Sequence, residues 1–271
     1  MIRVGVFGAG GRMGAEVCRA VAGDPGMSLV AAVDPKLVGQ TIGHVAGISG
    51  APANLVISEE AEALLDGEAD VAVDFTEPEE AFKNAQWCIK HAMHAVIGTT
   101  GIFEDKIRSL EELLEAEGNE SNVFIAPNFA IGAVLMMQFA RMAAKWLPDA
   151  EIIELHHAVK RDAPSGTALR TLEGILAGRM MAEGTPADEQ DIVEMLPGAR
   201  GAEKDGVRIH SVRLPGLVAH QEVIFGGEGQ TLTIRHDSMD RSSFMPGVLL
   251  AIRQVSSMSG VTVGLEKLLG L

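Results

Sequence analysis

The sequence predicts an α/β fold in two parts: a doubly wound domain built on a parallel sheet, and a second α+β domain with a mixed or antiparallel sheet. Two observations predict the first part. Short apolar runs alternate with helical patterns over about 130 residues, and the runs are almost continuously apolar, as in strands covered on both faces. A third observation predicts the second part, because the alternation then stops and strand-like segments follow one another across Gly-rich turns.

The elements of both parts can be placed from these patterns. In the first part, strands are expected at residues 2–7, 28–33, 71–75, 95–98 and 123–126, and helices at residues 12–22, 59–65, 78–91 and 104–117. In the second part, helices are expected at residues 130–146 and 165–181, and strands at residues 151–156, 207–212, 219–225 and 230–235. Residues 182–206 are expected to form a mobile loop, and a last helix at residues 244–255 is expected to pack on the first domain.

Composition limits the classes of function. The 271 residues carry a net charge of −15 and include 47% hydrophobic residues, which suits a globular enzyme and disfavours binding to nucleic acid or to an anionic membrane. Cys18 and Cys88 both fall in predicted helices and are expected to be core residues, without a disulfide or a metal-thiolate site. No signal-peptide pattern or long apolar run is present, so a cytoplasmic protein is expected.

A glycine-rich turn follows the first predicted strand and opens a helix. Gly8 and Gly10 allow the bend and let backbone N–H groups approach a pyrophosphate, while Gly14 permits close packing of helix on strand. The spacing is G-x-G-x-x-x-G instead of G-x-G-x-x-G, and a structural turn is the alternative. The position of the turn favours a dinucleotide site, and the residues expected to contact the cofactor there are Gly8, Ala9, Gly10, Gly11, Arg12 and Met13.

The cofactor preference depends on Asp34, which ends the second predicted strand. Its carboxylate can accept hydrogen bonds from both adenosine ribose hydroxyls and would repel a 2′-phosphate, which favours NADH. Arg12 and Lys36 are close enough in sequence to pair with that phosphate, so NADPH stays open, with a slight preference for NADH.

Two further segments follow strands at the edge where a nicotinamide should lie. Both could be plain turns, but beside the glycine turn they are expected to bind the cofactor. They comprise Gly98, Thr99 and Thr100 after the fourth strand, and Ala126, Pro127, Asn128 and Phe129 after the fifth.

The most informative stretch is residues 154–168, in which His156, His157 and Lys160 come shortly before a predicted helix start. Adjacent residues on a strand point to opposite faces, so one His can donate a proton while the other orients the substrate. A structural role for one of them is the alternative. Lys160 can donate a proton or pair with a carboxylate, and no third His is nearby to complete a metal site.

The helix that begins after Pro164 offers a site for a carboxylate. Ser165 is expected to cap the helix, and Gly166 and Thr167 would present backbone N–H groups at its positive dipole end. A capped helix with nothing bound is the alternative. With the glycine turn, the cluster favours a nicotinamide-dependent reductase of an anionic substrate.

These motifs resemble the dihydrodipicolinate reductase family. The resemblance rests on the glycine turn of residues 8–14, on Asp-Phe-Thr at 74–76, on Val-Ile-Gly-Thr-Thr-Gly at 96–101, on Pro-Asn-Phe at 127–129, and above all on residues 154–167. It implies NAD(P)H-dependent reduction of 4-hydroxy-tetrahydrodipicolinate to tetrahydrodipicolinate in the diaminopimelate route to lysine.

The resemblance also implies roles for particular residues. His156 would be the proton donor/acceptor, Lys160 would be a proton donor, and His157 with Gly166 and Thr167 would hold the substrate's carboxylates. A dinucleotide-binding domain of residues 1–127 and 241–271, a substrate-binding and oligomerisation domain of residues 128–240, and a homotetramer are further implications.

Two positions depart from the family pattern. Pro35 stands where relatives often have a basic residue for the 2′-phosphate, which puts NADPH use in doubt, and Val159 replaces a His that precedes the catalytic Lys in a relative. Two alternatives remain: an NAD-dependent dehydrogenase of another small acid, and a non-catalytic NAD(H) redox sensor.

Overall fold

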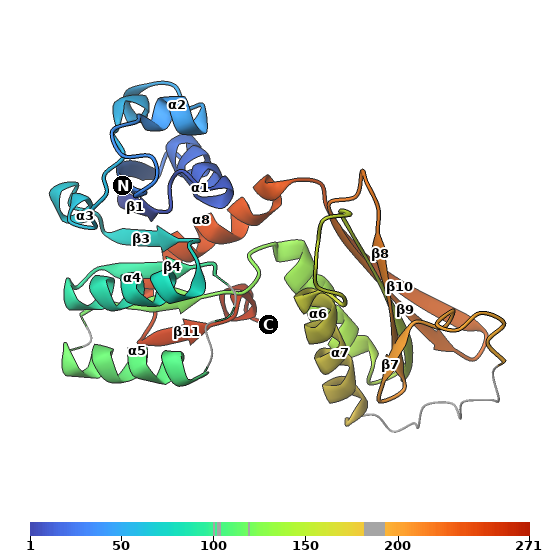
Figure 1. The fold of residues 1–271 in the computed structure, drawn as a ribbon. Coiled ribbons are helices and arrows are strands. Elements are labelled where there is room, and N and C mark those ends of the chain that lie inside the picture. Colours follow the sequence, from blue (N-terminus) through green and yellow to red (C-terminus); the bar gives the residue numbers. More distant parts are fainter. Residues whose placement is uncertain (100, 102–103, 119, 182–192) are drawn as a thin grey trace. The chain divides into compact units, whose positions relative to one another are not determined.

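The computed structural model describes residues 1–99, 101, 104–118, 120–181 and 193–271. Their contacts divide the chain into two units, Met1–Phe129 with Arg241–Leu271, and Ala130–Asp240. Each unit has its own sheet (Figure 1), and the expected combination of a parallel sheet with a second, mixed sheet is confirmed.

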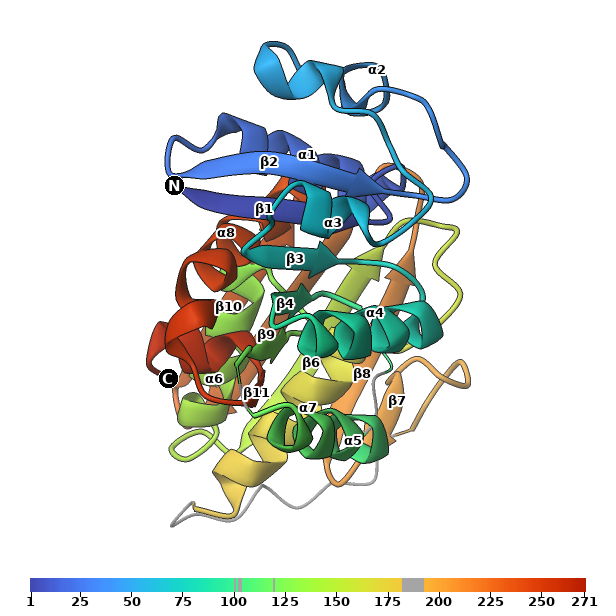
Figure 2. The same cartoon turned by 90° about the vertical axis from the view of Figure 1, so that its left-hand side faces the viewer.

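The first unit is a six-stranded parallel sheet in the order β11-β5-β4-β3-β1-β2. Helices α4 and α5 cover one face of this sheet, and helices α1 and α8 cover the other (Figures 1 and 2). The strands are β1 (Ile2–Phe7), β2 (Met27–Val33), β3 (Val71–Asp74), β4 (His94–Ile97), β5 (Val123–Ile125) and β11 (Val261–Val263). The helices are α1 (Arg12–Gly23), α2 (Ile42–Ala46), α3 (Ala63–Asp66), α4 (Pro78–Lys90), α5 (Glu104–Ala116) and α8 (Met245–Gln254), with short 3-10 turns at Ala51–Asn54, Arg241–Phe244, Val255–Ser257 and Leu265–Leu269.

Burial of both faces explains the apolar strands. The side of the sheet under α4 and α5 holds a core that includes Leu110 and Leu114 of α5, Ile97 of β4, and Cys88 of α4, all of them buried. Cys18 of α1 is buried as well, so the prediction that both thiols are core residues is confirmed.

The second unit is a five-stranded mixed sheet in the order β10-β9-β6-β8-β7. Strands β6 and β8 run parallel, and the other neighbours run antiparallel. Alternate residues of β6, such as Ala150 and Ile152, are buried against helices α6 and α7. The elements are α6 (Ile131–Ala143), β6 (Asp149–His156), α7 (Gly166–Arg179), β7 (Ala202–Lys204), β8 (Val207–Arg213), β9 (Ala219–Gly227) and β10 (Gln230–Ser238).

Two predicted elements were wrong in extent. The helix expected at residues 59–65 is only α3, because Ser58 pairs with Val33 beside β2 and accepts the Glu60 N–H with its hydroxyl, which holds this segment extended. The loop expected at residues 182–206 contains β7, and its residues 182–192 lie outside the described part of the chain. Strand β11 and helix α2 were not predicted, because three and five residues are too few to show a clear periodicity.

Candidate active site

The glycine turn joins β1 to α1. Gly8 has a φ of +65°, which favours glycine, and Gly11 is the N-cap of α1. A Cβ on Gly14 would lie 2.0 Å from the carbonyl oxygen of Gly8, so only glycine lets the helix approach the turn this closely. The turn therefore has the tight strand-to-helix geometry that places backbone N–H groups before a phosphate.

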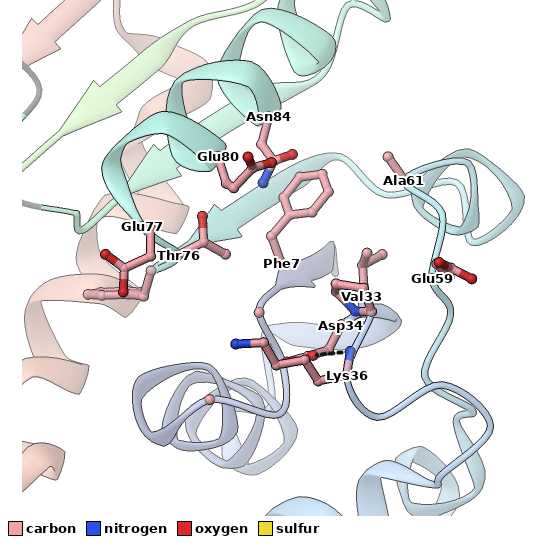
Figure 3. Close-up of a pocket in the computed structure, with 14 residues that line it drawn as sticks. Phe7, Val33, Asp34, Lys36, Glu59, Ala61, Thr76, Glu77, Glu80 and Asn84 are labelled. Atoms are coloured by element: carbon pink, nitrogen blue, oxygen red, sulfur yellow. Dashed lines mark hydrogen bonds between the residues drawn. The ribbon is translucent and has the colours of Figure 1, made fainter.

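A cavity of about 410 Å³ lies beside this turn, at the carboxyl ends of β1, β2 and β3. Figure 3 shows Asp34 and Lys36 on one side of it, and Thr76, Glu77 and Glu80 on the other. Gly8, Gly11 and Asp34 are the residues expected from the sequence that line it.

The Asp34 carboxylate is fixed in this cavity by backbone donors. Its Oδ2 accepts the Gly10 N–H at 3.0 Å, and its Oδ1 accepts the Lys36 N–H at 2.9 Å. A carboxylate oxygen can accept more than one hydrogen bond, so Asp34 keeps acceptor capacity for a ligand hydroxyl.

The segment after β3 forms a wall of the cavity, and no role for this segment was predicted from the sequence. The buried Asp74 carboxylate accepts hydrogen bonds from the backbone N–H of Thr76 (2.6 Å), the Thr76 hydroxyl (2.7 Å) and the Asn84 side chain (2.7 Å). The Thr99 hydroxyl donates to the Thr76 carbonyl at 2.7 Å, so three hydrogen bonds hold Thr76. Its position after a parallel strand was the signal that could have identified it.

A second cavity of about 200 Å³ gathers most of the expected nicotinamide-side residues. Phe75 lines both cavities, and a Cβ on Gly98 would lie 2.0 Å from its ring. The cavity is lined by Met13, Phe75, Gly98, Pro127, Asn128, Phe129 and Phe244.

Several expected cofactor residues lie elsewhere among the described residues. Ala9 and Ala126 are fully buried, Thr99 is buried behind Thr76, and Arg12 is exposed at the start of α1. Gly10 contacts Asp34 but is not among the residues that line either cavity. Thr100 lies outside the described residues.

In the second unit, His156 ends β6 on the face that is covered by helices. Glu154, two residues earlier on the same face, is fully buried, and its carboxylate contacts Nδ1 of His156. Burial alone would raise the pKa of Glu154, but hydrogen bonds from His156, Arg213 and Ser211 lower it to about 2. Glu154 is therefore ionised at neutral pH.

Arg213 connects this pair to the loop that contains Lys160. Its two terminal nitrogens donate to the two Glu154 oxygens at 2.9 and 2.8 Å, and one of them also donates to the Asp162 carbonyl at 2.7 Å. Lys160 Nζ lies 2.8 Å from both carboxylate oxygens of Asp162, which lowers the pKa of that carboxyl group. His156 and Lys160 thus belong to one network, and Arg213, which connects them, was not predicted from the sequence.

Two of the expected carboxylate-binding residues, Gly166 and Thr167, begin α7. Ser165 caps the helix by accepting the Ala168 N–H at 3.2 Å, which confirms the predicted cap. Gly166 is exposed in the first helical turn, where backbone N–H groups have no acceptor within a helix. His157 is exposed, and its backbone N–H donates to the Val218 carbonyl.

Other chemistries find less support among the described residues. Burial raises the pKa of the Cys18 thiol to about 12 and also raises that of Cys88, so neither is a ready nucleophile. The described side chains contain no group of three His, Cys, Asp or Glu residues arranged for a metal. Within the same part of the chain, no helix has the length and apolar character needed to cross a membrane.

Comparison with known proteins identifies the family. Models described as dihydrodipicolinate reductase, N-terminus, and dihydrodipicolinate reductase, C-terminus, match residues 2–129 and 132–269. The 4-hydroxy-tetrahydrodipicolinate reductases of Desulfitobacterium hafniense (strain DSM 10664 / DCB-2) and Syntrophomonas wolfei subsp. wolfei are 48% and 50% identical, covering 99% and 98% of this chain and 98% of each relative. The dipicolinate-bound dihydrodipicolinate reductase from Paenisporosarcina sp. TG-14 has a TM-score of 0.84 and 42% identity, covering 98% of this chain and 99% of that one. The chain therefore belongs to the dihydrodipicolinate reductase family.

Proposed function

We propose that the protein reduces 4-hydroxy-tetrahydrodipicolinate to tetrahydrodipicolinate with NADH or NADPH, in the diaminopimelate route to lysine. The observation that carries the proposal is the network from His156 through Glu154, Arg213 and Asp162 to Lys160, which gathers two proton donors near a helix start. The names of the relatives support the substrate, and the dipicolinate in the Paenisporosarcina structure supports a ring dicarboxylate as ligand.

In this proposal His156 and Lys160 supply protons. The 4-hydroxyl of the substrate leaves as water together with a proton from the adjacent ring carbon, which gives a conjugated ring. The reduced nicotinamide, when bound, would supply a hydride to that ring. The addition leaves negative charge on a neighbouring ring atom, and the His156 imidazolium neutralises it by donating a proton. Lys160, held by Asp162, is the second donor, and its ammonium also attracts an anionic substrate.

The substrate's carboxylates are assigned to His157, Gly166 and Thr167. The start of α7 favours an anion because its backbone N–H groups and its dipole present positive charge there. Ser165 caps the helix through the Ala168 amide, one position beyond the two amides assigned to the substrate. The exposed His157 ring lies just past the end of β6 and can reach a ligand.

The first unit fits a dinucleotide. Gly8 and Gly11 line the larger cavity, a Cβ on Gly8 would lie 2.8 Å from the Thr76 methyl group, and the two cavities lie along the carboxyl edge of the sheet. The pyrophosphate is assigned to the glycine turn, the adenosine ribose to Asp34, and the nicotinamide to the cavity of Pro127, Asn128 and Phe129.

We infer a preference for NADH from the charges of the larger cavity. Asp34, Glu59, Glu77 and Glu80 line it, and Lys36 is the one basic residue among the described residues that do so. A 2′-phosphate would meet this negative charge, whereas two ribose hydroxyls can donate to Asp34.

The function and the preference are tested in one assay. Absorbance at 340 nm is followed with NADH or NADPH while a synthase generates the substrate from pyruvate and aspartate semialdehyde. We expect kcat/KM to be about tenfold higher with NADH, which corresponds to roughly 1.4 kcal/mol. Asp34→Ala should make kcat/KM similar for the two cofactors. Glu111 is an exposed acidic residue of α5, and Glu111→Ala should leave the preference for NADH unchanged.

The possible results distinguish the proposed reaction from the proposed cofactor preference. No oxidation above the synthase-only control, with protein that still binds dinucleotide, would move the assignment to another small acid or to a redox sensor. Equal use of both cofactors by the wild-type protein would contradict the role given to Asp34 but leave the reaction in place.

We also propose a homotetramer assembled through the sheet of the second unit. Helices α6 and α7 pack on one face of this sheet, and in the described chain no helix of this unit covers the other face (Figure 1). That face carries Ile153, Leu155 and Ile224, whose neighbours Ile152 and Val223 point into the core. Light scattering after size exclusion should give four times the mass of 28.6 kDa, and a monomer would contradict the proposal.

We also propose that the protein is cytoplasmic. Both cysteines are free and buried, which suits a reducing compartment. Cell fractionation should recover the protein with soluble metabolic enzymes and apart from membranes and nucleic acid.

A further inference from the structure

Glu154 is a buried carboxylate with no direct role in the proposed reaction. It shares the inner face of β6 with Ala150 and Ile152, where an apolar residue would pack against α6 and α7. Instead, its two oxygens accept the fork of Arg213, and Oε2 also contacts Nδ1 of His156. The arrangement places a carboxylate behind the imidazole that is assigned to donate the proton.

The charge of Glu154 decides which nitrogen of His156 carries hydrogen. With its pKa lowered to about 2 despite burial, Glu154 is ionised at neutral pH and can only accept hydrogen bonds. Nδ1 of His156 must therefore be the donor in this contact. In the neutral ring Nε2 then has the lone pair, and in the imidazolium Nε2 carries the transferable proton.

Arg213 also holds the loop that contains Lys160. Its guanidinium bonds to Glu154 and also to the Asp162 carbonyl, and the Asp162 carboxylate holds Lys160. Its Nε is buried without a hydrogen-bond partner among the described atoms, which costs stability. A buried ion pair with such a cost contributes little to the stability of a fold. The Glu154–Arg213 pair is therefore better explained by the orientation that it gives to neighbouring groups.

We propose that Glu154 and Arg213 are positioning residues: Glu154 holds the His156 ring through Nδ1, Arg213 holds Glu154, and Nε2 is the nitrogen that exchanges the proton. This role rests on the proposed function. In the transfer, the Nε2–H bond of the imidazolium breaks, the proton bonds to the substrate atom that became negative, and the ring returns to its neutral form with hydrogen on Nδ1. Solvent then returns the proton to Nε2.

The test is Glu154→Gln in the full-length protein. Both carboxylate oxygens accept hydrogen bonds from Arg213. The Gln amide has only one acceptor oxygen, so either its NH₂ group faces a guanidinium nitrogen or one hydrogen bond to Arg213 is lost. We expect kcat to fall on the order of 10²-fold with little change in KM for either substrate. The ¹⁵N shifts of His156, assigned with His156→Asn, should show hydrogen on Nδ1 in the wild-type protein and loss of that preference in Glu154→Gln.

Two further variants separate positioning from stability. Ile152→Val, on the same strand and face, removes a methylene from the core and should lower Tm without changing kcat or the His156 shifts. Arg213→Lys keeps the positive charge but cannot donate to both Glu154 oxygens in the same way, and it should retain more activity than Arg213→Met. This pair of variants tests the positioning role independently if Glu154→Gln does not fold.

The outcomes distinguish this inference from the function on which it rests. Active wild-type protein with unchanged kcat and unchanged His156 shifts in Glu154→Gln would overturn the positioning role alone. Wild-type protein that fails to oxidise NADH or NADPH in the synthase-coupled assay would overturn the proposed function, and the positioning role with it.

Discussion

Replacing His156 with Ala is expected to lower kcat by about 10²–10⁴-fold, the usual contribution of a positioned acid. The imidazole ends β6 against the ionised Glu154, so its loss removes the donor that neutralises the charge left by hydride addition. The KM for NADH should stay nearly constant, because the expected dinucleotide residues belong to the other unit. Steady-state kinetics in the synthase-coupled assay measure both quantities.

His44→Ala is the matched control for that loss. His44 is an exposed histidine of α2, and its removal should leave kcat unchanged. Lys160→Ala should also lower kcat, because it removes the second proton donor. If His156→Ala kept full activity and unfolded like the wild-type protein, another residue would have to donate the proton. The proposed mechanism would then lose its main support.

The sequence predicted the local part of this site better than the part made by tertiary contacts. Glu154 and His156 are two residues apart on a strand, so alternation alone places them on one face. Arg213 is 59 residues from Glu154 and meets it only because β8 pairs with β6 in a register that sets Arg213 opposite His156. No periodicity in the sequence encodes that register.

A similar distinction holds in the rest of the fold. The buried strands and the glycine turn could be placed because burial on both faces leaves a continuous apolar run. The hairpin of β7 and β8 was missed although Asp205 and Gly206, both with positive φ, form the Asp-Gly connection typical of tight hairpins. Helix α3 was placed too early because Ser58 pairs beside β2, a contact that helical spacing cannot reveal.

Gly14→Ala is expected to be the most destabilising single substitution in the glycine turn. The new Cβ would lie 2.0 Å from the Gly8 carbonyl oxygen and 2.7 Å from its carbon, and both are backbone atoms that cannot rotate away. Helix α1 must therefore shift from β1, at a cost of about 3 kcal/mol. The same shift moves the N–H groups assigned to the pyrophosphate, so NADH affinity should fall by more than about tenfold, as titrated by calorimetry.

Gly23→Ala provides the comparison within the same helix. Gly23 is the last residue of α1, and a Cβ there would meet nothing within 4 Å. This change should leave NADH affinity intact and leave stability equal or slightly higher, because Ala is the better helix former. If thermal unfolding and NADH titration gave the same values for both variants, α1 would not need to approach the turn closely. If NADH affinity falls in Gly14→Ala and not in Gly23→Ala, dinucleotide binding depends on the close contact between Gly14 and the Gly8 carbonyl, and that contact leaves no room for a side chain at residue 14.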